Sequence, residues 1–124
     1  MGNKIKDFTD LVVWQEGHQL VLAIYKTTKN FPKEEVFSLI SQMRRCVVSV
    51  TSNIAEGFSR KSYNDKIRFY FIARGSLTEL ENQLLISRDL SYIDAEEFDI
   101  INKKIVSVHK LLNGLIRKSN LLST

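Results

Sequence analysis

The chain has 124 residues, of which 44% are hydrophobic and 26% charged, and its formal net charge is +4. This length is typical of one domain with its own hydrophobic core. The low content of five glycines and one proline favours helix over sheet, and the single cysteine excludes an intramolecular disulfide. A net charge this small does not by itself indicate a nucleic-acid partner.

No targeting or membrane segment is visible in the sequence. The first ten residues, MGNKIKDFTD, lack the apolar run of a signal peptide, and Lys6 stands where the myristoylation pattern has serine or threonine. No stretch approaches the roughly 18 apolar residues of a membrane span. One cysteine fits a reducing compartment. We therefore expect a soluble, cytoplasmic protein without a membrane partner.

The first predicted helix covers residues 11–29 and follows a polar N-terminal arm at residues 1–10. Thr9 or Asp10 can cap this helix. One face carries residues at alternating steps of three and four: Leu11, Trp14, His18, Val21, Tyr25 and Thr28. We interpret His18 as a satisfied residue of the core or its edge, and Trp14 as core or interface. Pro32 ends this segment and suits the first turn of the next helix.

The second predicted helix begins at residue 36, ends between residues 57 and 59, and has the most regular pattern in the chain. Its apolar residues alternate between steps of four and three over three heptads: Val36, Ile40, Met43, Val47, Val50 and Ile54. Glu34 and Glu35 stand at its start, where the helix dipole favours acidic residues. The pattern predicts a helix that buries one stripe against other helices.

The third predicted helix begins at Ser62, with Asp65 three residues later as a variant of the capping box, and fades through residues 88–90. Five apolar residues form its seam: Tyr70, Ala73, Leu77, Leu80 and Leu84. A second row widens the apolar face and predicts that much of this helix is buried: Ile67, Phe71, Leu85 and Ile86.

The fourth predicted helix begins with the capping pair Asp94 and Glu97. One face is apolar along its length: Phe98, Ile101, Ile105, Val108, Leu112 and Leu115. Residues 119–124 show no clear period and are assigned to a C-terminal tail. Four amphipathic helices joined by short turns predict a single all-α domain over residues 1–124, an antiparallel up-down-up-down four-helix bundle.

Several sequence blocks carry a resemblance to a known family. Residues 41–45 read SQMRR, residues 53–57 read NIAEG and residues 72–80 read IARGSLTEL. Over about residues 8–92 the chain resembles the 23S rRNA intervening-sequence proteins, bacterial four-helix bundles whose biochemical role is not established. The fourth helix matches only in pattern. Ser38 stands where the family tends to have glycine, and Cys46 where alanine is usual.

The resemblance also carries implications for assembly and partners. The family is similar to the accessory variability proteins of diversity-generating retroelements, which form ring-shaped homopentamers and bind nucleic acid. It therefore implies a homo-oligomer, with a pentamer as the model, and RNA or DNA as a partner. A ring would bring equivalent ends of the subunits together into one patch.

The charges separate along the predicted bundle axis. An antiparallel bundle places both termini and the turn between the second and third helices at one end. That end gathers cations that we interpret as a nucleic-acid-binding site contacting phosphates with little sequence preference: Arg60, Lys61, Lys66, Arg68, Arg117 and Lys118, with Lys4 and Lys6 nearby. Asp7, Asp10 and Asp65 oppose these cations. The opposite end holds Asp89, Asp94, Glu96, Glu97 and Asp99, partly offset by Lys26, Lys29 and Lys33. A plain solvated bundle end is the alternative interpretation.

A second polar set lies mainly on the second helix and is interpreted as a structural polar network or subunit interface: Arg44, Arg45, Asn53 and Glu56, with Arg74 and Glu79 of the third helix. Arg45 and Glu56 are too far apart on one helix to pair, so each is expected to find a partner elsewhere, such as Arg74 or Glu79. A ligand or RNA site is the alternative. Small residues beside this set are suited to a close subunit or partner contact, with a plain solvent-exposed face as the alternative: Ser38, Ser41, Ser49, Ser52, Gly75 and Ser76.

No catalytic, metal-binding or cofactor-binding motif is visible. His18 and His109 lie on different helices without a carboxylate at metal-ligand spacing, and no nucleophile elbow, zinc-binding cysteine set or phosphate loop occurs. Cys46 is interpreted as a small buried residue. We expect a self-assembling protein without enzymatic activity, cofactor or metal, binding nucleic acid through its basic end. The alternative is an adaptor or accessory subunit of a nucleic-acid enzyme that does not itself bind nucleic acid.

Overall fold

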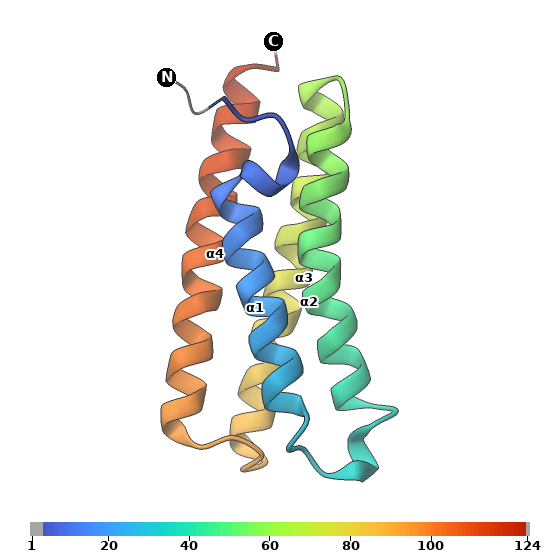
Figure 1. The fold of residues 1–124 in the computed structure, drawn as a ribbon, viewed down its shortest axis with the longest axis vertical. Helices are drawn as coiled ribbons and strands as arrows, with labels where there is room; N and C mark the ends of the chain where they lie inside the picture. Colours follow the sequence, from blue (N-terminus) through green and yellow to red (C-terminus); the bar gives the residue numbers. More distant parts are fainter. Residues whose placement is uncertain (1–3, 124) are drawn as a thin grey trace.

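The computed structural model describes residues 4–123 and consists of four helices packed side by side (Figure 1). The main helices are α1 (Val12–Thr28), α2 (Leu39–Ser59), α3 (Tyr63–Asp89) and α4 (Ala95–Leu121); two short 3-10 helices are η1 (Phe8–Asp10) and η2 (Lys33–Glu35). Each long helix contacts two others, in the cyclic order α1, α2, α3, α4. The predicted all-α four-helix bundle is confirmed. No helix within residues 4–123 is long and apolar enough to cross a membrane.

The core is formed by one stripe from each helix, and the predicted stripes of α2 and α3 are confirmed along α2 from Ile40 to Ile54 and along α3 from Tyr70 to Leu84. Ser62 and Asp94 cap α3 and α4 as predicted, each accepting a hydrogen bond from the backbone amide three residues later, at 3.1 and 2.8 Å. These two starts fix where α3 and α4 begin relative to the core.

The predicted stripe of α1 has buried ends at Leu11 and Thr28, but between them it was wrong by one position. Its buried residues include Val13, Gly17, Leu20 and Ile24 rather than the row through Tyr25, which is 38% exposed. Gly17 hides the true stripe from a hydrophobic pattern because it has no side chain; an added Cβ would lie 3.0 Å from a methyl group of α2. α1 therefore lies close to α2 at a residue that a search for apolar side chains passes over.

Trp14 and His18 lie at the edge of the core. Their rings stack with centroids 4.8 Å apart, and both side chains are half-buried. This placement agrees with the edge role interpreted for His18. Neither Thr9 nor Asp10 caps α1 with its side chain, since the Asp10 carboxylate instead accepts the backbone amides of Lys6 and Asp7.

α2 begins at Leu39, three residues after the predicted start. The Glu35 carboxylate accepts hydrogen bonds from the Ser38 hydroxyl at 2.5 Å, the Leu39 amide at 3.4 Å and the Tyr92 hydroxyl at 2.7 Å. These bonds lower the pKa of Glu35, the Ser38 bond contributing most. Glu35 thus ties the turn to the α3–α4 connection, and Val36 is left 44% exposed outside the core.

Two other expectations differ from the structure. Of the second apolar row of α3, only Ile67 is buried, whereas Phe71, Leu85 and Ile86 are 38–44% exposed on its outer face. α4 continues through Leu121, so residue 119 lies within the helix rather than in a tail, and the Ser119 side chain is buried. The longer α4 carries its last turn to the end of the bundle where α3 begins.

Gly57 of the NIAEG block allows α2 and α3 to lie close together. A Cβ at this position would be 2.7 Å from Cε1 of Tyr70, a ring that is only 1% exposed. We expect Gly57→Ala to lower the free energy of unfolding by about 1–3 kcal/mol, because the packed ring has little room to move. Urea denaturation would measure the change.

Gly114→Ala is the matched control for this prediction. An added Cβ at Gly114 has its nearest neighbour at 3.8 Å, an ordinary contact, and alanine is the better helix former by about 1 kcal/mol. This variant should be as stable as the unmodified protein or more so. Equal destabilisation by both substitutions would contradict the role assigned to Gly57.

Candidate nucleic-acid interface

Both termini and the α2–α3 turn lie at the same end of the bundle, the upper end in Figure 1. We call this the basic end, because the end of α2, the start of α3 and the end of α4 bring six cationic residues to it: Arg60, Lys61, Lys66, Arg68, Arg117 and Lys118. The topology therefore assembles the predicted set, but the six side chains have different surroundings.

Arg60 and Arg68 are each paired with an acid of their own helix region. Arg60 lies 2.9 Å from Glu56, and Arg68 lies 3.2 Å from Asp65. Both guanidinium groups also lie over the ring of Phe69, at 4.6 and 5.6 Å from its centroid. The neighbouring carboxylates offset much of the positive charge that these two arginines would offer to a phosphate.

Lys66 stabilises the α2–α3 turn. Its ammonium group donates a hydrogen bond to the backbone carbonyl of Phe58 at 2.6 Å, near the C-terminal end of α2. The side chain is half-buried, and this desolvation lowers the pKa of Lys66. A helix C-terminus favours a cation at this place, so part of the hydrogen-bonding capacity of Lys66 is already used.

Lys61, Arg117 and Lys118 are exposed, and none of them forms an ion pair with another residue in the 4–123 range. Lys61 comes from the α2–α3 connection and the other two from the last turns of α4. These three residues are therefore the cations of the basic end that are best placed to meet an anionic partner.

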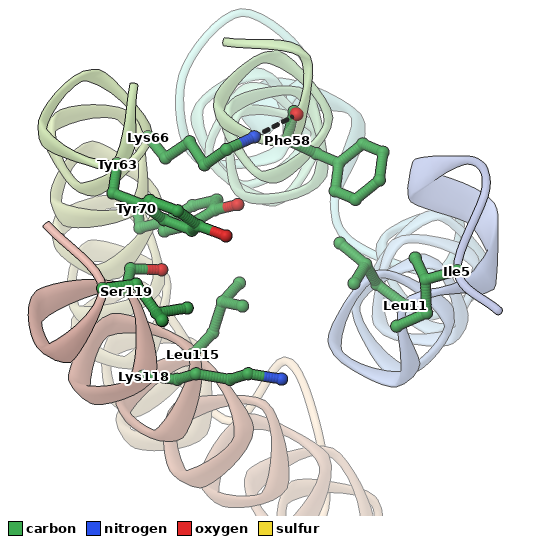
Figure 2. A pocket seen from close by; sticks show the side chains of 10 residues that line it. Ile5, Leu11, Phe58, Tyr63, Lys66, Tyr70, Leu115, Lys118 and Ser119 are labelled. Carbon is green, nitrogen blue, oxygen red and sulfur yellow. Dashed lines mark hydrogen bonds between the residues drawn. The ribbon is translucent and has the colours of Figure 1, made fainter. Parts of the chain in front are cut away.

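A cavity of about 200 Å³ opens among the helix ends at the basic end (Figure 2). Its lining comes from the N-terminal arm, the residue before α1, the end of α2, the start of α3 and the end of α4: Ile5, Leu11, Phe58, Tyr63, Lys66, Tyr70, Leu115, Lys118, Ser119 and Leu122. The Tyr70 hydroxyl points into it, and burial raises the pKa of Tyr70 to about 12. Among residues 4–123, no aspartate or glutamate lines this cavity.

The polar set of α2 and α3 does not form one network. Arg44 donates to the Thr28 hydroxyl at 2.9 Å and to the Tyr25 carbonyl at 3.3 Å, and so binds the C-terminal end of α1. Glu56 pairs with Arg60 of its own helix end, so the expectation of a partner on α3 was wrong. These contacts are local and hold the chain's own helices together.

The remaining members of that set also make separate contacts. Asn53 donates to the Ser49 carbonyl at 2.8 Å, while Arg74 donates to Asn113 of α4 at 3.0 Å, a partner that the sequence pattern did not suggest. Arg45 and Glu79 are exposed and line a shallow groove between α2 and α3. No ion pair joins them in the part of the chain that the structure describes.

At one place, small residues of α2 and α3 contact each other within the chain. The hydroxyls of Ser49 and Ser76 lie 2.8 Å apart, so these two serines join the helices rather than offering a surface to another subunit. Gly75 differs, because an added Cβ there would have no neighbour within 4 Å. Among the small residues of α3, Gly75 thus lacks a packing reason inside the bundle.

Cys46 is buried, as expected, and accepts a hydrogen bond from the Gln83 amide at 3.5 Å. Burial raises the pKa of its thiol, which disfavours the reactive thiolate. Burial lowers the pKa of His109 on α4, favouring the neutral imidazole. Within the described range, no group of three or more His, Cys, Asp or Glu side chains is placed to hold a metal ion.

Comparison with known proteins places these features in a family context. The model of the family described as 23S rRNA-intervening sequence protein matches residues 9–114, which extends past residue 92 into α4. A crystal structure from Bacteroides thetaiotaomicron, of a protein with unknown function from the S23 ribosomal protein family, is similar with a TM-score of 0.79 and 25% identity. The similarity covers 86% of this chain and 96% of that one. Among curated proteins, none matches significantly.

Proposed function

We propose that this chain, which belongs to the 23S rRNA-intervening sequence protein family, is a non-enzymatic, self-assembling bundle that binds the backbone of RNA or DNA through its basic end. One observation carries the proposal: Lys61, Arg117 and Lys118 converge there from two distant segments without an ion-pair partner in residues 4–123. Cations so placed attract phosphates irrespective of base sequence.

The opposite end supports this polarity because its acidic residues Asp89, Asp94, Glu96, Glu97 and Asp99 outnumber the exposed lysines near them, Lys26, Lys29 and Lys33. Asp94 caps α4, Glu97 accepts a hydrogen bond from Thr27, and Asp99 pairs with Lys103 at 3.4 Å. An elongated molecule with a basic and an acidic end orients itself in the field of a polyanion. The basic end would therefore meet nucleic acid first.

The outer face of α3 supports self-assembly. Phe71, Ile72, Leu85 and Ile86 are 38–49% exposed, and Gly75 lies between them on this helix. A glycine inside a helix costs roughly 0.5–1 kcal/mol relative to alanine, and no neighbour in the chain requires one here. Apolar side chains around a glycine suit the close approach of a helix from a second copy. A ring of such copies, pentameric as in the accessory variability proteins, would gather several basic ends.

The direct test is the molar mass by light scattering, with and without a generic RNA at low and high salt. We expect a multiple of the 14.3-kDa chain mass, which increases with RNA at low salt and not at high salt. A 14.3-kDa species whose mass does not change when RNA is added at low salt would contradict both self-assembly and nucleic-acid binding. It would favour the alternative of an adaptor or accessory subunit, in which the α3 face binds a nucleic-acid enzyme and the chain itself does not bind nucleic acid.

A further inference from the structure

We infer that the cavity at the basic end takes one unstacked nucleobase, so that the preferred ligand is a single strand rather than a continuous duplex. The inference rests on the proposed function and adds the kind of nucleic acid that the same site would recognise. In a duplex the bases are paired and stacked, and a base enters a protein pocket only after it has left the stack.

The lining of the cavity has the chemistry of a base pocket. Phe58, Leu11 and Leu115 supply apolar walls, while Tyr63, Tyr70 and Ser119 supply hydroxyl groups (Figure 2). Unstacked bases bind proteins by contact with aromatic and apolar faces and by hydrogen bonds to their edges. The volume of about 200 Å³ is below the roughly 300–1,000 Å³ of pockets for drug-sized ligands, which suits a single ring system.

Tyr70 is the independent sign that the cavity takes a polar ligand. Its side chain is 1% exposed, and its hydroxyl points into the cavity without a hydrogen bond to another described residue. The hydroxyl oxygen is not among the fully buried polar atoms that lack a partner, so its small accessible area faces the cavity. The close approach to Gly57 holds the ring in place, and the hydroxyl can therefore form a hydrogen bond with a polar group that enters the cavity.

The cations near the cavity explain why the ligand would be part of a strand. Lys118 lines the cavity itself, and Lys61 and Arg117 lie at the same end of the bundle. A nucleotide within a strand has a phosphate on each side of its base, so a base in the cavity would bring phosphates toward these cations. A small apolar ligand with a single anionic group would need only one of these three cations.

The test compares two fluorescently labelled probes by anisotropy at one low salt concentration: a single-stranded RNA without self-complementarity and a blunt-ended duplex of the same sequence. We expect the unmodified protein to bind the single strand about tenfold more tightly. Tyr70→Phe should weaken single-strand binding about 3- to 10-fold, the effect of one lost hydrogen bond, and leave duplex binding and the salt dependence unchanged. Tyr25→Phe, at the other end of α1, is the control and should change neither affinity.

Leu115→Phe provides a second variant, because added volume at this half-buried wall would fill the cavity without removing a hydroxyl. It should also remove the preference for the single strand. Equal affinities of the unmodified protein for both probes, or no effect of either cavity variant when circular dichroism shows both folded, would overturn the inference and leave backbone binding intact. Failure of both probes to bind at low salt would overturn the inference together with the proposed function.

Discussion

Replacing Lys61, Arg117 and Lys118 together by glutamate is expected to weaken RNA binding about 100-fold at low salt. The change removes three phosphate contacts and places three carboxylates at the basic end. The slope of log affinity against log salt should fall by about 3, because each phosphate contact contributes about one unit. Binding isotherms at several salt concentrations, with circular dichroism to verify the fold, would measure both effects.

The structure decides which cations belong in this variant. Arg60 and Arg68 are paired with Glu56 and Asp65, so their reversal would set like charges together and disturb the α2–α3 turn as well as binding. The ammonium group of Lys66 donates a hydrogen bond to the Phe58 carbonyl at 2.6 Å. Substitution of any of these three would mix a structural effect with an electrostatic one.

The matched control reverses three lysines at the end of α1 and in η2, which changes the net charge by the same amount: Lys26, Lys29 and Lys33. All three are exposed, and at about 0.1 M salt, where the Debye length is about 10 Å, we expect the control to retain binding within a factor of about 3. Equal loss in both variants would mean that the net charge, rather than the basic end, governs binding.

Sequence patterns predicted the parts of the fold that depend on local chemistry. The stripes of α2 and α3 follow a sustained heptad period, and the caps at Ser62 and Asp94 act over three residues. The two errors have different causes. α2 starts late because Glu35 binds Tyr92, which is 57 residues away, and the α1 stripe was misplaced because Gly17 contributes no apolar side chain.

The candidate site was predictable only as a collection of charges. Antiparallel topology sufficed to bring six cations to one end, but the pairing of Arg60 with Glu56 and the bond from Lys66 to a carbonyl depend on side-chain positions. The cavity was not predictable, because its lining comes from separate segments of the chain and includes Ser119, which was assigned to a tail. The proximity of Gly57 to Tyr70 likewise appears only when α2 and α3 are placed together.

Gly75→Leu is expected to convert the assembled protein into single chains of 14.3 kDa, measured by light scattering. An added side chain at Gly75 meets nothing within the bundle but would keep a second helix from approaching the α3 face. The isolated chain should gain rather than lose stability, since leucine is favoured over glycine inside a helix by roughly 0.8 kcal/mol. A loss of mass without a loss of helical signal would therefore be a property of the interface.

Lys110→Leu, on α4, is the control for Gly75→Leu because it adds an exposed leucine to a different helix. It should leave the assembly unchanged. If Gly75→Leu keeps the mass of the unmodified assembly, the interface lies away from Gly75, and the exposed side chains of Phe71 and Ile72 need another partner. If it yields single chains, RNA affinity in the same samples shows whether binding needs several basic ends: a fall toward the affinity of one subunit would show that the assembly supplies avidity.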